Sequence, residues 1–294
     1  MIQNPGKALR EMLGKSGIVM MPGVYDGISA RVAEQAGFKA LYLTGAGASA
    51  SGIGEADIGF ATMNDFADNA RRITIKAGIP AMCDADTGFG NPLNVIRTVH
   101  EFEAAGIAAV QIEDQVSPKR CGHLTGKQVV LVGDFVQKIR AAANEKFFKD
   151  TVIVARTDAR AVYDLDTTLD RAKSYLDAGA DILFVEALTS VDEVERVGRE
   201  LGGSAWLIAN QVLGGKTPRL TAKELEQMGY KIVIFPDALP YGASVVLRDI
   251  CDNIKKNGTG YDAIPGNYNT SLDLFLTMGM EEWSGKEALY KEEI

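Results

Sequence analysis

Short apolar runs alternate with amphipathic helical segments along almost the whole chain, and this alternation limits the possible folds more than any other feature. The apolar runs are of the type that is buried on both faces of a parallel sheet. Strands are predicted at residues 18–21, 40–43, 79–83, 108–112, 151–155, 182–185, 205–209 and 231–235. Eight strand–helix units in a chain of 294 residues predict an α/β fold, a (β/α)8 TIM-type barrel.

A doubly wound open sheet is the alternative fold. Its functional residues would gather at one switch point, whereas here polar residues follow nearly every strand, which favours the barrel. Within the barrel, Pro22 and Gly23 predict the end of the first strand, and the run from Thr44 to Ala48 predicts a loop.

The barrel is expected to occupy residues 1–257, with no linker inside it. Residues 258–294 lie beyond the eighth unit and mix apolar side chains, such as Leu272, Phe275 and Trp283, with charged ones. We expect this C-terminal helical extension to pack on the barrel or on a neighbouring subunit, because so many large apolar side chains rarely stay in water.

Charge and cysteine usage limit the partners and the compartment. The net charge of −8 shows no nucleic-acid footprint, and no apolar stretch is long enough to cross a bilayer. Three widely spaced cysteines, Cys83, Cys121 and Cys251, argue against a disulfide framework and for a reducing compartment. A cytoplasmic protein without a nucleic-acid or membrane partner is therefore expected.

Carboxylates follow two successive strands. The third strand leads into Asp84 and Asp86, and the fourth ends at Glu113. Taken alone, an Asp-x-Asp pair after a strand is more often a turn or a helix cap than a metal site. In a barrel, however, the carboxyl ends of all strands meet at one mouth, where three carboxylates could hold an oxygen-preferring divalent cation.

Other strand ends offer groups that suit a small anion. Backbone N–H groups in the run from Thr44 to Gly47 could bind a carboxylate, and Arg156 could bind a second one through its planar fork. The alternatives are an ordinary βα turn and a surface ion pair. Tyr42, Glu186 and Asn210 also come at strand ends and would face the same mouth.

A thiol lies in a basic, glycine-rich stretch after the fourth strand. Cys121 is flanked by Lys119, Arg120 and His123, and positive charge nearby favours the thiolate. A lone cysteine is usually a small buried hydrophobe, but these surroundings are too polar for a core. Lys119 or Lys216 as the Schiff-base lysine of an aldolase is a weaker alternative, since neither lies inside a strand.

Four stretches in this order resemble signatures of the isocitrate lyase/phosphoenolpyruvate mutase superfamily: residues 84–91, 112–115, 119–123 and 155–159. The resemblance extends from about residue 21 to residue 247. The Cys121-Gly122-His123 run is similar to the carbon–carbon lyase branch, which includes 2-methylisocitrate lyases, 2,3-dimethylmalate lyases and oxaloacetate hydrolases. Residues 210–218 and 237–241 look more like the latter two groups, and Pro240 stands near the place where the hydrolases carry a serine, which argues against hydrolysis.

The resemblance implies a Mg²⁺ (or Mn²⁺) ion held by Asp84, partly through water, with Asp86, Glu113 and Asp57 nearby. It implies a small dicarboxylate substrate bound by the residues Tyr42, Thr44, Gly45, Ala46, Asp57, Gly122, Arg156, Glu186, Asn210, Thr217 and Pro240. It also implies a homotetramer in which C-terminal helices are exchanged between subunits.

The implied reaction breaks the C2–C3 bond of a substituted malate, with 2,3-dimethylmalate, giving pyruvate and propionate, as the expected substrate. Cys121 would protonate the carbanion that results, and His123 would stabilise it as an enediolate; Glu113 and Arg156 are the other predicted catalytic residues. The alternatives are a 2-methylisocitrate lyase, an oxaloacetate hydrolase and a barrel without activity that serves in assembly. The intact acidic cluster, thiol and Arg156 argue against the last.

Overall fold

The computed structural model describes residues 2–120, 126–264 and 270–291. The chain divides into two compact units, residues 1–240 and residues 241–294. The predicted division after residue 257 stays a prediction. No helix in the described part of the chain is long and apolar enough to cross a membrane.

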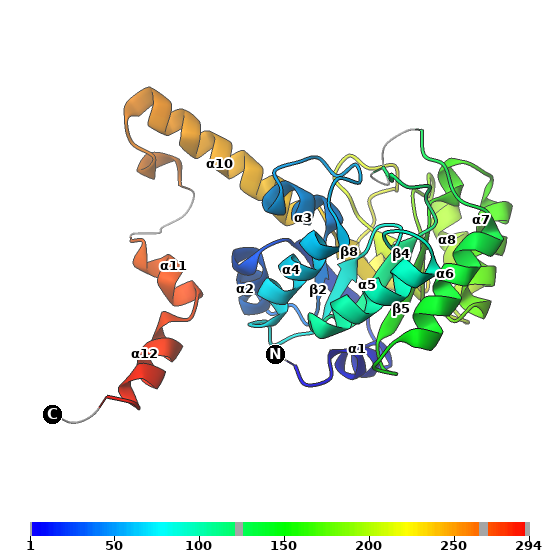
Figure 1. Cartoon of the computed structure of the whole chain (residues 1–294). Helices are drawn as coiled ribbons and strands as arrows, with labels where there is room; N and C mark the ends of the chain where they lie inside the picture. The colour runs from blue at the N-terminus through cyan, green and yellow to red at the C-terminus, as the bar shows by residue number, and fades with distance from the viewer. Residues whose placement is uncertain (1, 121–125, 265–269, 292–294) are drawn as a thin grey trace. The chain divides into compact units, whose positions relative to one another are not determined.

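The first unit is a closed barrel of eight parallel strands, in which each strand pairs with its neighbours in sequence and β1 pairs with β8 (Figure 1). The strands are β1 (Val19–Val24), β2 (Leu41–Leu43), β3 (Ala81–Asp84), β4 (Ala109–Glu113), β5 (Val152–Thr157), β6 (Ile182–Val185), β7 (Trp206–Asn210) and β8 (Ile232–Phe235). The predicted (β/α)8 fold is therefore confirmed.

Helices precede, connect and surround the strands. They are α1 (Pro5–Leu13), α2 (Gly27–Gln35), α3 (Gly45–Gly52), α4 (Met63–Thr74), α5 (Pro92–Ala104), α6 (Val132–Glu145), the short η1 (Ala159–Ala161), α7 (Leu165–Asp177), α8 (Val191–Leu201), α9 (Ala222–Gln227) and the first residues of α10 (Ala238–Asn257). Polar N-cap side chains accept a hydrogen bond from the first turn of many of them, for example Asp26, Thr62, Asn91, Ser190 and Thr221.

Two apolar layers hold the barrel together. One layer fills the space between the strands and the surrounding helices, with Phe66, Phe102 and Phe135 fully buried in it. The other fills the barrel interior and includes Leu9 and Leu13 of α1. Helix α1 joins the interior core at the end of the barrel where the strands begin. The polar residues at the carboxyl ends of the strands therefore lie at the opposite mouth of the barrel.

Two local predictions were wrong, and both concern glycine. The first strand does not end at Pro22 but continues to Val24, and Pro22 pairs with Phe235 of β8. Gly23 allows this because a Cβ there would lie 2.3 Å from the carbonyl oxygen of Pro236. The predicted loop at residues 44–48 is instead the start of α3, with Thr44 as its N-cap residue.

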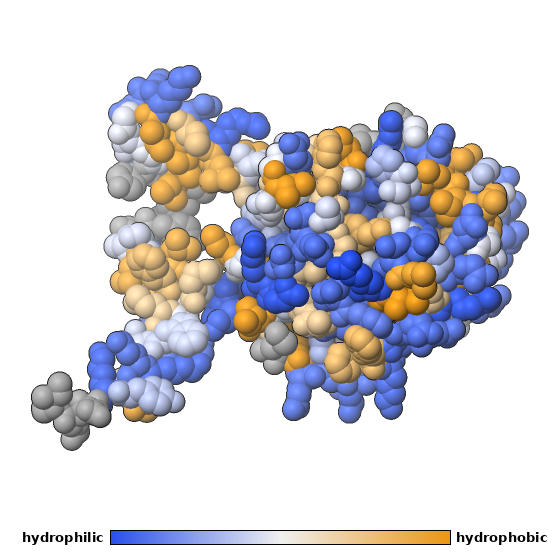
Figure 2. Space-filling model, in the orientation of Figure 1, coloured by the Kyte–Doolittle hydropathy of each residue, from blue (hydrophilic) through white to orange (hydrophobic). Residues whose placement is uncertain are grey.

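The second unit consists of helices whose described residues are not buried. It contains most of α10, then η2 (Tyr261–Ala263), α11 (Leu272–Thr277) and α12 (Met280–Ala288). Figure 2 shows hydrophobic side chains gathered on α10 and α11. Leu272, Leu274, Phe275 and Trp283 are among the exposed apolar residues of this unit.

Candidate active site

The carboxyl ends of the strands bring most of the predicted site residues to one mouth of the barrel. Asp84 ends β3, Glu113 ends β4 and Asn210 ends β7, while Arg156 lies in β5 and Glu186 directly follows β6. All five are buried, with at most 7% of each residue exposed. Buried polar groups need partners, and their partners show how the site is built.

Asp84 is held by the side-chain amide of a residue in the neighbouring strand β4. Gln111, fully buried in β4, donates a hydrogen bond from Nε2 to Asp84 Oδ1 at 3.2 Å. The same amide pairs with the hydroxyl of Tyr42, which is itself 2% exposed. Tyr42 therefore lies beneath the carboxylate and supports it through Gln111.

The N-terminus of α3 faces the carboxylates. A Cβ on Gly45 would lie 2.8 Å from Asp84 Oδ2 and 3.6 Å from Asp86 Oδ1, so no side chain fits there. Gly45 and Ala46 are the first two residues of the helix, and their N–H groups have no partner within it. The sequence predicted that a turn would present free N–H groups here. In the structure the first turn of helix α3 presents them instead.

Asp86 adopts a backbone conformation that is unusual for a residue with a side chain. Its φ is +46°, and it is held there by a bond from its N–H to Asp84 Oδ1 (3.1 Å) and one from the N–H of Glu113 to its carbonyl (2.8 Å). Such backbone strain tends to occur at functional sites. Here it turns a second carboxylate toward the first.

Lys119 connects the segment after β4 to the acidic cluster. Its ammonium group pairs with Asp57 Oδ1 at 2.5 Å and with Asp86 Oδ1 at 2.9 Å. Burial would lower the pKa of Lys119, but Asp86 and Asp57 raise it well above its ordinary value. A lysine held in the charged form is unsuited to Schiff-base chemistry, which disfavours the aldolase alternative.

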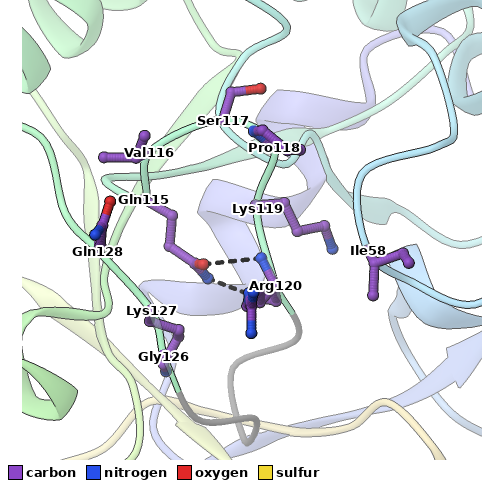
Figure 3. A pocket seen from close by; sticks show the side chains of 10 residues that line it. All are labelled: Ile58, Gln115, Val116, Ser117, Pro118, Lys119, Arg120, Gly126, Lys127 and Gln128. Atoms are coloured by element: carbon purple, nitrogen blue, oxygen red, sulfur yellow. Dashed lines mark hydrogen bonds between the residues drawn. The ribbon is translucent and has the colours of Figure 1, made fainter.

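Figure 3 shows the segment around Lys119, which borders a cavity of about 620 Å³. Gln115 fixes the backbone of Arg120 from both sides: its Nε2 donates to the Arg120 carbonyl (2.8 Å), and its Oε1 accepts from the Arg120 N–H (3.0 Å). The chain is thus firmly positioned up to the residue before Cys121.

Arg156 is the cation that Glu113, Asp158 and Glu186 surround. Its Nε lies 3.2 Å from Glu113 Oε2 and donates to Asp158 Oδ2 at 2.9 Å, and its Nη2 lies 3.6 Å from Glu186 Oε2. Asn210 Nδ2 donates to Glu186 Oε2 at 2.9 Å. The predicted strand-end residues Glu113, Arg156, Glu186 and Asn210 therefore form one connected group.

The cluster contains more acidic than basic side chains, and the buried acids are costly to ionise together. Burial raises the pKa of Asp84 above its ordinary value, that of Asp86 to about 7, and that of Glu113 well above its ordinary value. In the described part of the mouth the acids outnumber the bases. The acids are Asp57, Asp84, Asp86, Glu113, Asp158 and Glu186, and the bases are Lys119, Lys127 and Arg156. An additional cation would relieve this excess.

These residues fit a divalent metal ion that keeps much of its water. Within the described residues, no three Asp, Glu, His or Cys side chains form a ready-made metal site. Mg²⁺ needs none, because it commonly binds one or two carboxylates and several waters. Among the described residues, none gives a hydrogen bond to the buried Glu113 Oε1, as expected for a group that would face such a hydrated ion.

Several predicted residues are not part of the described cluster. Cys121, Gly122 and His123 lie outside the described residues. Thr217 and Pro240 are half-buried in the segments after β7 and β8 and make no described hydrogen bond to the carboxylates or to Arg156. Pro240 lies in the first turn of α10 and not in a preceding turn.

Three supporting residues were missed, and two of them have a signal in the sequence. Asp158 is two residues after Arg156 and could have been identified from that spacing. Gln111, a buried amide within an apolar strand, is unusual enough to be noticed. Lys127 has no sequence signal that separates it from a surface lysine, although it is 7% exposed and pairs with Asp158 at 2.6 Å.

Comparison with known proteins gives similarity over nearly the whole chain. The sequence profile of the phosphoenolpyruvate phosphomutase family matches residues 9–255. The 2,3-dimethylmalate lyase of Eubacterium barkeri is 43% identical over 256 residues, which cover 87% of this chain and 88% of that protein. The 2-methylisocitrate lyase of Aeropyrum pernix is 42% identical over 287 residues, which cover 98% of this chain and 91% of that protein.

Solved structures agree in fold over the same length. A crystal structure of 2,3-dimethylmalate lyase has a TM-score of 0.91 at 39% identity and covers 98% of this chain and 96% of its own. Oxaloacetate acetylhydrolase with the inhibitor 3,3-difluorooxalacetate has a TM-score of 0.92 at 34% identity, covering 99% of both chains. Phosphonopyruvate hydrolase with oxalate and Mg²⁺ has a TM-score of 0.86 at 27% identity, covering 98% and 99%.

Proposed function

Because the chain belongs to the phosphoenolpyruvate mutase/isocitrate lyase superfamily, we propose that it is a divalent-metal-dependent carbon–carbon lyase of a substituted malate. The observation that carries this proposal is the buried acidic cluster of Asp84, Asp86 and Glu113 beside Arg156 at the barrel mouth. Such a site suits a metal ion together with a small dicarboxylate. The specific reaction proposed is cleavage of 2,3-dimethylmalate to pyruvate and propionate.

Asp84 would hold the metal ion, with Asp86 and Glu113 contributing through water. Bound there, Mg²⁺ or Mn²⁺ would favour loss of the proton from a substrate hydroxyl and polarise the adjacent carboxylate. Phosphonopyruvate hydrolase, a structural relative, was solved with Mg²⁺ and oxalate, which supports a cation at this mouth.

The chain's own groups would hold the substrate and move the protons. Arg156 and the N–H groups of Gly45 and Ala46 would bind the carboxylate next to the hydroxyl. Glu113 would accept the hydroxyl proton, since burial raises its pKa and its Oε1 accepts no hydrogen bond from the part of the chain that the structure describes. The C2–C3 bond would then break, and C2 would become the carbonyl carbon of the keto acid. The electron pair of the broken bond would pass to C3, which Cys121 would protonate.

The choice of 2,3-dimethylmalate rests on the relatives and on the apolar character of residues 239–240. The relative from Eubacterium barkeri bears that name, and so does a structural neighbour. Leu239, however, packs against the apolar layer outside the strands, so Pro240 is the residue whose apolar surface would favour a methyl group at C3. One buried methyl group discriminates by about 1–3 kcal/mol.

A 2-methylisocitrate lyase is the second candidate, because a relative of that name aligns with 98% of the chain. The deciding experiment compares kcat/KM for 2,3-dimethylmalate, 2-methylisocitrate, isocitrate and oxaloacetate in the presence of Mg²⁺. We expect 2,3-dimethylmalate to be preferred and pyruvate and propionate to form. A preference of about tenfold or more for 2-methylisocitrate would overturn the substrate assignment, and release of oxalate from oxaloacetate would indicate a hydrolase.

We further propose that the protein is a cytoplasmic homotetramer in which the C-terminal extension packs on a neighbouring subunit. The exposed apolar residues of α11 and α12, such as Phe275 and Trp283, support this proposal because they are not buried within the described chain. Light scattering of the full chain and of a chain that ends at residue 257 tests it. A full chain that stays monomeric at micromolar concentration would contradict the proposal.

A further inference from the structure

Arg156 is fixed from one side by Asp158. Its Nε donates to Asp158 Oδ2 at 2.9 Å and its Nη2 to Asp158 Oδ1 at 3.2 Å, so the two side chains form a two-point pair. The guanidinium group also lies over the ring of Phe184, 5.2 Å from its centre. Among the described residues, none accepts a hydrogen bond from Nη1, which is the nitrogen that remains for a ligand.

Asp158 is itself held on two further sides. It is fully buried, accepts a hydrogen bond from Lys127 Nζ at 2.6 Å, and donates its own N–H to Asp114 Oδ1 at 2.9 Å. Asp114 in turn accepts from Tyr175 and Arg171 of α7, at 2.8 and 3.1 Å. The orientation of Arg156 therefore depends on a continuous buried network that reaches the outer helix layer.

Lys127 enters this network from the long connection between β4 and α6. It is buried, and its ion pair with Asp158 is 1% exposed on the lysine side and fully buried on the aspartate side. A buried carboxylate that faces only one cation could pair with it in more than one geometry. A second cation at Asp158 Oδ1 fixes the carboxylate and, through it, the plane of the guanidinium group.

We propose that Asp158 and Lys127 are positioning residues that orient Arg156 so that its Nη1 faces the substrate carboxylate. This inference rests on the proposed function for the identity of the ligand, but the geometry of Arg156 does not depend on it. A purely structural role, in which the pair only stabilises the fold, is the alternative that the experiment must exclude.

The test uses the full-length protein with Mg²⁺ and compares three variants. In Lys127→Met and Asp158→Asn, KM for the substrate should rise by about tenfold, with little change in kcat, because carboxylate binding is weakened equally in the ground state and the transition state. Arg160→Met is the matched control. It removes an ion pair to Glu193 close to β5 but has no described contact with Arg156 or Asp158, so it should leave KM unchanged.

Two further measurements separate positioning from stability. Lys127→Arg keeps a cation that can reach Asp158 and should restore most of the lost affinity. Calorimetric titration with oxalate and Mg²⁺ should show the same loss for Lys127→Met as the KM values do. If Lys127→Met and Asp158→Asn lower Tm but keep the wild-type KM and oxalate affinity, the positioning role is wrong.

A failure of the proposed function would be recognised separately. If the wild-type protein turns over none of the malates, that function fails, and the crystal structure of Asp158→Asn still decides the present inference. A reoriented Arg156 guanidinium group supports it. A guanidinium group in its original place would overturn it, whatever the substrate is.

Discussion

Replacing Gly45 by alanine is the sharpest test of the proposed metal site. The new Cβ would lie 2.8 Å from Asp84 Oδ2, so that oxygen must move by about 0.6 Å before the contact becomes an ordinary one. Asp84 cannot simply swing away, because its Oδ1 is held by Gln111 Nε2 and by the N–H of Asp86. A metal-holding carboxylate tolerates displacements of only about 0.5 Å.

The expected result is a loss of metal affinity without a comparable loss of stability. We expect the Mg²⁺ concentration for half-maximal activity to rise by at least about tenfold in Gly45→Ala. Alanine is favoured over glycine within a helix by about 1 kcal/mol, which offsets part of the strain of moving Asp84. The free energy of unfolding, measured in urea without metal, should therefore change by less than about 1–2 kcal/mol.

Gly52 provides the matched control, because it lies in the same helix and a Cβ there meets nothing within 4 Å. Gly52→Ala should keep the Mg²⁺ dependence of the wild-type protein. If Gly45→Ala also keeps the wild-type Mg²⁺ dependence at full activity, then the Asp84 carboxylate is not the group that holds the metal, and the proposed metal site is wrong.

Three further outcomes are expected. Protein treated with a chelator should lose activity, and Mg²⁺ or Mn²⁺ should restore it; full turnover in excess chelator would refute the metal requirement. Cys121→Ala should lower kcat by more than about 100-fold while the fold and oxalate binding are retained, as expected for loss of the proton donor; substantial residual turnover would exclude that role. Burial alone would raise the pKa of Asp158, but Arg156 and Lys127 lower it to about 2, below the value of about 3.9 in an unfolded chain. The stability that this carboxylate contributes is therefore fully present above about pH 4 and is lost as the pH falls toward 2, so urea unfolding of the wild type and Asp158→Asn should differ more at pH 7 than at pH 3.

The barrel could be predicted from the sequence because its strands are apolar on both faces and are followed by polar residues. Strand and helix positions agree with the structure within a few residues, and the strand ends at Asp84, Glu113 and Asn210 are correct. The errors arose where a glycine was interpreted by its flexibility alone. At Gly23 and Gly45 the absence of a side chain serves close packing against Pro236 and Asp84, which depends on segments distant in sequence.

The site could be predicted only as far as charge and strand position determine it. The acids and Arg156 could be identified from their places at or near strand ends, but their pairing could not. Asp158 joins Arg156 rather than solvent because Lys127, from a different connection, balances its charge. No local pattern links Lys127 to Asp158, since these two residues are 31 positions apart.

Lys119 shows how pairing changes a chemical interpretation. The sequence places its charge next to Cys121, which suggests that it helps to form the thiolate. In the structure its ammonium group lies between Asp57 and Asp86, so much of its field is neutralised by these carboxylates. Lys119 therefore serves first as a countercharge within the acidic cluster, and it links that cluster to the chain immediately before the thiol. On the other side of the same stretch, Lys127 makes the corresponding link to Asp158 and Arg156. The residues on both sides of Cys121 are thus tied to the two halves of the candidate site, the proposed metal-binding acids and the proposed carboxylate-binding arginine.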